Sequence, residues 1–133
     1  MGEELGLSGL ITGLGHRPHG EILRLLKNAD LLLAINYEGW STLIPAKIYE
    51  YWAVGGPPIL LLSCPGAASS FVEHNHLGFT ADPSDVTTIQ QVLMTVYHQW
   101  KSGVPMHISS IGIEAYDRNA LTYELAQLLS IVV

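Results

Sequence analysis

The stretch that decides the fold is ADLLLAINYEGWSTLIPAKIYEYWAVGGPPILLL, residues 29–62. It contains two short apolar runs, residues 31–35 and 59–62, on either side of a segment that begins at Pro45. Short apolar runs bounded by turn residues are typical of buried strands, and proline is well tolerated in the first turn of a helix. The sequence therefore predicts two parallel strands joined by a helix from Pro45 to about Val54. Because the first run is apolar on both faces, we expect it to be a central strand.

The alternation of strand and helix continues on both sides of this stretch. Upstream, we expect a first strand over residues 10–14 and a short helix over residues 21–27. Downstream, we expect a helix that ends near His74 and a strand over residues 78–81. Alternating strands and helices indicate a parallel sheet with helices on both faces. The prediction is a Rossmann-like α/β fold with four parallel strands in residues 10–81, which binds ligands beyond the carboxyl ends of the strands.

Two further helices are expected after the last strand. The first has Ser84 or Asp85 as its N-cap and ends near Gly103. The second opens at Asp117-Arg118. Both helices carry apolar residues at helical spacing. In the first helix these are Val86, Ile89, Val92, Leu93, Val96 and Trp100, and in the second Leu121, Leu125, Leu128 and Val132.

Composition limits the classes of function. The 133 residues are 48% hydrophobic and 14% charged, as expected of one packed domain. The six basic residues are scattered and the net charge is −6, so we expect no nucleic-acid partner. A single cysteine, Cys64, suits a reducing compartment, and the apolar runs are too short to cross a bilayer. We expect a cytoplasmic protein, with the inner face of the membrane as an alternative for the full-length chain.

A series of motifs identifies a candidate family. The pattern AD-strand, loop, K-x-x-E-Y-x-A-x-G-x-P, strand occupies residues 29–59. Further matches follow in the same order: PG at 65–66, GF at 78–79, DPSD at 82–85 and YDR at 116–118. From about residue 10 to about residue 130 this order resembles the C-terminal, donor-binding domain of family 4 glycosyltransferases, which have the GT-B fold.

The resemblance implies that residues 1–133 are part of a nucleotide-sugar-binding domain, the C-terminal half of a GT-B fold. The full-length protein would be an enzyme of carbohydrate biosynthesis that transfers a sugar from a nucleotide-diphosphate sugar and needs no other cofactor. Its acceptor would be held by an N-terminal domain that is missing here, so we expect the fragment alone to be inactive. With strand units missing, an exposed sheet edge and apolar face also predict self-association of the fragment.

The resemblance also assigns site residues. Glu50 matches the family's ribose-binding glutamate, and a carboxylate can accept both hydroxyls of a ribose diol. The alternative is a surface carboxylate that pairs with Lys47. The backbone amides of Thr42, Leu43 and Ile44 match the segment that faces the diphosphate at the start of the next helix, where Lys47 could add positive charge.

The loop at residues 16–19 matches the segment against which the family places the nucleotide base. There, Arg17 can stack through its guanidinium plane, and the backbones of Pro18 and His19 can read the edge of the base. A turn chosen only for its shape is the alternative.

In one respect the sequence departs from the wider family, which has two glutamates eight positions apart. Thr42 stands where the first glutamate is expected, and Glu38 lies nearby in another register. The transferred sugar and the stereochemical outcome therefore remain open.

Other patterns suggest less. The histidines at positions 16, 19, 74 and 76 have no supporting cysteine or carboxylate at a ligand spacing, so we expect no metal site. Cys64 is interpreted as a small buried residue rather than a nucleophile. Two other functions fit the same fold: a fragment of a nucleotide-sugar epimerase, and a non-catalytic α/β binding module.

Overall fold

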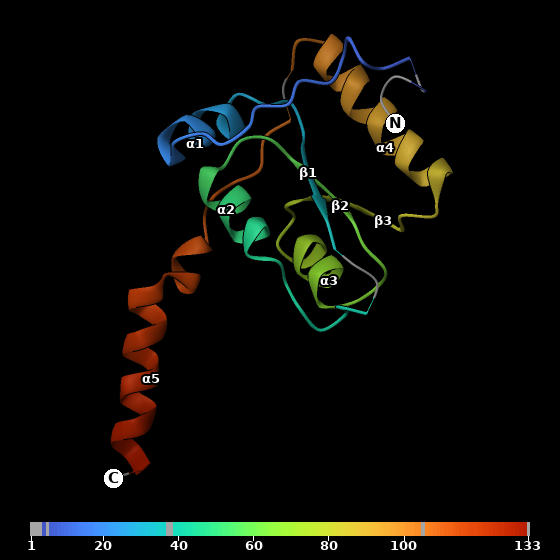
Figure 1. Cartoon of the computed structure of the whole chain (residues 1–133). Helices are drawn as coiled ribbons and strands as arrows, with labels where there is room; N and C mark the ends of the chain where they lie inside the picture. The colour runs from blue at the N-terminus through green and yellow to red at the C-terminus, as the bar shows by residue number, and fades with distance from the viewer. Residues whose placement is uncertain (1–3, 5, 37–38, 105, 133) are drawn as a thin grey trace.

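A computed structural model of the chain describes residues 4, 6–36, 39–104 and 106–132 (Figure 1). The helices and strands are, in order, α1 (His19–Lys27), β1 (Leu32–Ile35), α2 (Ala46–Val54), β2 (Ile59–Leu62), α3 (Ala67–His74), β3 (Gly78–Ala81), α4 (Val86–Lys101), the 3₁₀ helix η1 (Ile113–Tyr116) and α5 (Arg118–Val132). The predicted α/β class is confirmed: a parallel sheet in the order β1-β2-β3 is flanked by helices, as in a Rossmann-like fold.

The predicted strand over residues 10–14 is wrong. This segment has no strand in the structure, and Leu10 and Ile11 are 81% and 61% exposed. A strand needs a neighbour for its backbone N–H and C=O groups, and β1, at that side of the sheet, pairs only with β2 among the described residues. The described sheet therefore has three strands rather than four.

The position of β1 also differs from the prediction. It is an edge strand, and its residues alternate between buried and exposed: Leu32 and Ala34 face the core, whereas Leu33 and Ile35 are 52% and 57% exposed. The central strand is β2, in which Ile59–Leu61 are buried. Apolar side chains on both faces of β1 predicted burial, but burial depends on what covers each face.

The core lies between the sheet and helices α2 and α3. Ile48 of α2, Ile59 of β2, Val72 of α3 and the adjoining Leu77 are fully buried in it. Helix α1 packs against α2, and α4 contacts β3 (Figure 1). Because the three strands are parallel, their carboxyl ends all point to the same edge of the sheet.

Two glycines allow close backbone contacts within this core. A Cβ at Gly78 would lie 2.1 Å from the carbonyl oxygen of Ile59, and its φ of 143° is rarely adopted by other residues. A Cβ at Gly66 would lie 2.5 Å from the carbonyl oxygen of Ser41, which accepts a hydrogen bond from the Ala67 amide. The first contact brings β3 to β2, and the second ties the loop before α2 to the start of α3.

The chain after α4 returns to α2, which the sequence did not predict. Gly56 and Ile108 form an antiparallel bridge, and the indole Nε1 of Trp52 donates to the carbonyl of Ser109 at 2.9 Å. Tyr116 of η1 then packs against Trp52, with ring centroids 5.7 Å apart, and against Tyr49 at 5.3 Å. These contacts fix η1 beside α2.

Both C-terminal helices were predicted correctly, but their apolar stripes are mostly exposed. Asp85 is the N-cap of α4, and its side chain accepts from the Thr88 amide. Val96 is the buried residue of α4, whereas Trp100 is 57% exposed. Helix α5 extends away from the rest of the molecule, and residues 121–131 are all exposed (Figure 1).

Candidate functional site

Helix α2 carries the carboxylate at the centre of the candidate site. Lys47 and Glu50 are three residues apart, so they lie on the same side of the helix. The Lys47 Nζ lies 3.2 Å from Glu50 Oε2, and the Glu50 side chain is 30% exposed. Lys47 also lies over the ring of Tyr51, 5.9 Å from its centroid. Glu50 is thus oriented by a cation and still accessible to a ligand.

Tyr51 anchors this turn of α2 to the sheet. Its hydroxyl donates to the backbone carbonyl of Leu33 at 3.2 Å. Burial raises the pKa of Tyr51 above its ordinary value, Lys47 lowers it and Glu50 raises it. The phenol therefore stays protonated and can keep donating over the physiological range of pH.

Helix α1 brings a third predicted residue to the same place. His19 is the first residue of α1, and its Nδ1 lies 3.9 Å from Glu50 Oε1. A cavity of about 350 Å³ opens between the two helices beside this pair. It is lined by His19, Leu23, Lys27, Glu50, Ala53 and Val54. The site combines one carboxylate with apolar walls and the cationic Lys27.

A second cavity, of about 710 Å³, lies on the other side of Glu50, between α2 and η1. Tyr49, Tyr116 and Arg118 are among its lining residues. Tyr116 reaches this place because η1 folds back onto α2, a tertiary contact that no local sequence pattern signalled.

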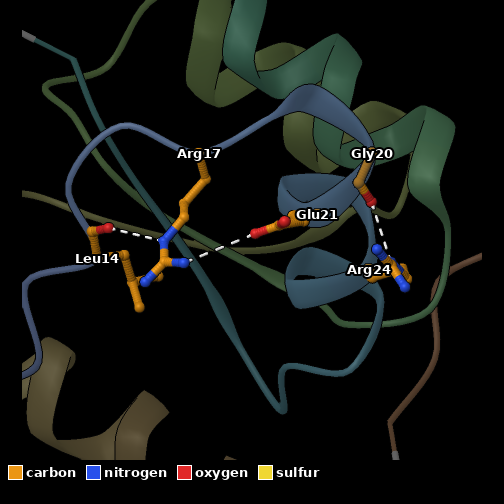
Figure 2. Close-up of polar contacts among 5 residues, drawn as sticks. All are labelled: Leu14, Arg17, Gly20, Glu21 and Arg24. Carbon is orange, nitrogen blue, oxygen red and sulfur yellow. Dashed lines mark hydrogen bonds and ion pairs between the residues drawn. The ribbon is translucent and has the colours of Figure 1, made fainter.

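Arg17 and Pro18 lie outside the Glu50 cavity. The Arg17 Nε donates to the carbonyl of Leu14 at 2.9 Å, and its Nη1 lies 3.7 Å from Glu21 Oε2 (Figure 2). Arg17 lines a separate cavity of about 390 Å³. Pro18 is the N-cap residue of α1, and its carbonyl accepts from the Glu21 amide at 2.9 Å.

The predicted phosphate-facing segment lies directly before α2. Thr42 and Leu43 are exposed there, and Ile44 is half-buried. The Leu43 amide donates to the Trp40 carbonyl at 3.1 Å, whereas the amides of Thr42 and Ile44 have no acceptor among the described residues. Two of the three predicted donors are therefore available to an anion. Glu38, in the same loop, lies outside the described residues.

Polar residues that the sequence did not assign to the site follow each strand at the carboxyl edge of the sheet. Asn36 follows β1 and is buried; its Nδ2 donates to the Trp40 carbonyl at 3.3 Å, but its Oδ1 has no partner in the described part of the chain. Ser63 follows β2 and is also buried. Asp82 follows β3, and its pKa is lowered by hydrogen bonds from the side chain and backbone of Ser84 and from Cys64. In the sequence, these residues could have been identified because each stands directly after an apolar run that predicts a strand.

Some arrangements are absent from the described residues. In residues 4, 6–36, 39–104 and 106–132, no group of three or more His, Cys, Asp or Glu side chains could hold a metal ion. Over the same ranges, no helix has the length and apolar content needed to cross a membrane. Cys64, predicted to be buried, is half-buried beside Asp82.

Comparisons with known proteins give no match. No family model matches the sequence, no curated protein matches it, and no solved structure matches the fold.

Proposed function

We propose that this chain is the donor-binding part of a GT-B glycosyltransferase and binds a nucleotide-diphosphate sugar. The observation that supports this most directly is the Glu50 carboxylate, which is half-buried, held by Lys47 at 3.2 Å and open to the cavity between α1 and α2. A ribose presents two neighbouring hydroxyl donors, and a fixed carboxylate is their strongest acceptor. In this proposal Glu50 binds the ribose.

The neighbouring residues suit the rest of such a ligand. The amides of Thr42 and Ile44, which have no acceptor among the described residues, lie at the amino end of α2, where the helix dipole and Lys47 favour a diphosphate. His19 lines the Glu50 cavity and Pro18 directly precedes it as the N-cap of α1, so in this proposal the base lies against this end of α1. Because Arg17 is held by Leu14 and Glu21, we assign the base contact to His19 and Pro18 rather than to the Arg17 guanidinium.

Transfer itself requires an acceptor, which a further domain would hold in a GT-B enzyme. The chain alone is therefore expected to bind the donor without turnover. Binding is the property to test first, since it separates a donor-binding domain from an α/β module with no nucleotide ligand.

The test is saturation-transfer NMR of the chain with UDP, GDP and ADP, followed by calorimetry with the nucleotide that binds best. Glu50→Gln keeps the shape of the side chain and removes its charge. Since a hydrogen bond to a charged group contributes about 1.5–3 kcal/mol, the affinity should fall about ten- to a hundred-fold. Glu73→Gln, which removes an exposed carboxylate bonded to Thr80, is the matched control and should bind as the parent does.

Two results would contradict the proposal. If no saturation is transferred from the chain to the ribose protons of UDP, GDP or ADP, the chain does not bind these nucleotides and the proposal is wrong. Equal nucleotide affinities of the parent and the Glu50→Gln chain would instead show that Glu50 does not bind the ribose. Glu50 would then be only a surface partner of Lys47, an exposed ion pair that contributes little to stability.

A further inference from the structure

Helix α5 has an apolar face that the rest of the described chain leaves largely uncovered. Leu121, Leu125 and Leu128 are 46%, 56% and 62% exposed, and the helix packs mainly against η1. It has 15 residues. A helix of this length that lacks tertiary packing is only marginally stable in water. The stability of α5 therefore depends on a surface that covers this face.

The exposed area of the chain is large enough for a stable interface. Its accessible surface is 9685 Å², whereas a compact monomer of 14.5 kDa exposes about 6,900 Å². The excess is about 2,800 Å², and a standard-size protein interface buries about 800 Å² on each partner. The exposed surface of the chain, of which the α5 face is a part, is therefore larger than a dimer interface needs.

The residue spacing along α5 fits a second copy of the same helix. Apolar residues at positions 121, 125, 128 and 132 follow one another at intervals of four, three and four, the pattern of coiled-coil core positions. Leu129 and Ile131 stand at the flanking positions and widen the apolar face. The helix has only two charged residues, Arg118 and Glu124, of opposite sign. Pairing two copies thus buries leucines without gathering like charges.

We propose that two copies of this chain associate through α5, leucine face to leucine face, in a symmetric dimer. The direction of α5, away from the sheet, leaves this face accessible (Figure 1). The sequence predicted self-association through an exposed sheet edge and an apolar face. That edge, β1, has only four residues, and very short edge strands are poor templates for pairing. The proposal is independent of nucleotide binding.

The experiment is sedimentation equilibrium of the complete chain over a range of concentrations. The parent chain should be a dimer at the higher concentrations. The double variant Leu125→Glu/Leu128→Glu places charges in the interface and should weaken association by about a hundred-fold or more. The matched control, Gln127→Glu/Ser130→Glu, adds the same charges on the opposite side of the helix and should dimerise as the parent does.

Circular dichroism at 222 nm provides a second test of the dimer that uses the parent chain alone. Because α5 is marginal alone, the helix signal of the parent should fall on dilution through the dimer dissociation range. The near-ultraviolet signal, to which the buried Trp52 contributes, should persist in the Leu125→Glu/Leu128→Glu chain and show that its core is folded.

Two outcomes would overturn the proposal. A parent chain that stays monomeric at every concentration would assign α5 to a different polypeptide. Association that survives Leu125→Glu/Leu128→Glu but is abolished by Leu33→Glu/Ile35→Glu would place the interface at the sheet edge.

Discussion

Residues 29–81 and the two ends of the chain carry apolar side chains of the same kinds but bury them to different extents. In the first region, Leu60 and Leu61 of β2 are 2% and 0% exposed. At the ends, Leu10 is 81% exposed and Leu129 of α5 is 59% exposed. The two regions differ in backbone pairing: β2 has a hydrogen-bonded strand on each side, whereas neither residues 10–14 nor α5 pairs with a strand among the described residues. Apolar content alone therefore does not identify a core.

The largest expected change in the free energy of unfolding tests whether close backbone pairing distinguishes the two regions. Gly78→Ala places a Cβ 2.1 Å from the Ile59 carbonyl oxygen at a φ of 143°, so β3 must move away from β2. We expect the free energy of unfolding to fall by about 3–5 kcal/mol in urea titrations. Gly13→Ala, in the N-terminal segment where a Cβ meets no atom within 4 Å, should change it by less than about 0.5 kcal/mol. Similar losses in both variants would contradict the comparison.

The next effect concerns the same side chain in the two regions. Leu61→Ala removes a fully buried side chain and should cost about 2–5 kcal/mol of unfolding free energy. Leu129→Ala, at a concentration where the chain is monomeric, should cost less than about 0.5 kcal/mol. Urea unfolding followed by Trp fluorescence measures both. A large loss at Leu129 in the monomer would show that α5 packs on its own chain.

The smallest effect concerns α4, which lies between the two regions and depends on its cap. The Asp85 carboxylate accepts from the Thr88 hydroxyl and amide at 2.6 and 3.0 Å, and these bonds lower the pKa of Asp85 below its ordinary value of 3.8. Since the folded-state pKa is lowered, the charged cap stabilises the fold above the ordinary pKa. That stability is lost as the pH falls through the folded-state value.

Asp85→Asn should therefore be less stable than the parent at about pH 6, and the difference should shrink towards about pH 2. Chemical unfolding at a series of pH values measures this. Thr88→Ala removes the hydroxyl that donates to Asp85, so the free energy of unfolding of this variant should also depend less on pH than that of the parent. A difference that is constant with pH would mean that the charge of Asp85 does not contribute.

Much of the fold followed from local patterns. The strands β2 and β3 lie where the apolar runs placed them, and α2 begins directly after Pro45. Within the candidate site, the Lys47–Glu50 pair follows from helical spacing alone. The environment of Arg17 could not be predicted, because it depends on the Leu14 carbonyl and on Glu21 in the folded loop.

The sequence by itself determined where the strands β1 to β3 and the helices α1 to α5 lie, since periodicity, proline and glycine act over a few residues. Only the tertiary structure decided that β1 is an edge strand of the described sheet, that residues 10–14 form no strand, and that η1 lies beside Glu50. Each of these depends on contacts between residues far apart in the chain. Local patterns carry no information about such contacts. The free energy of burial is gained only when two surfaces meet, and a local pattern describes only one of them.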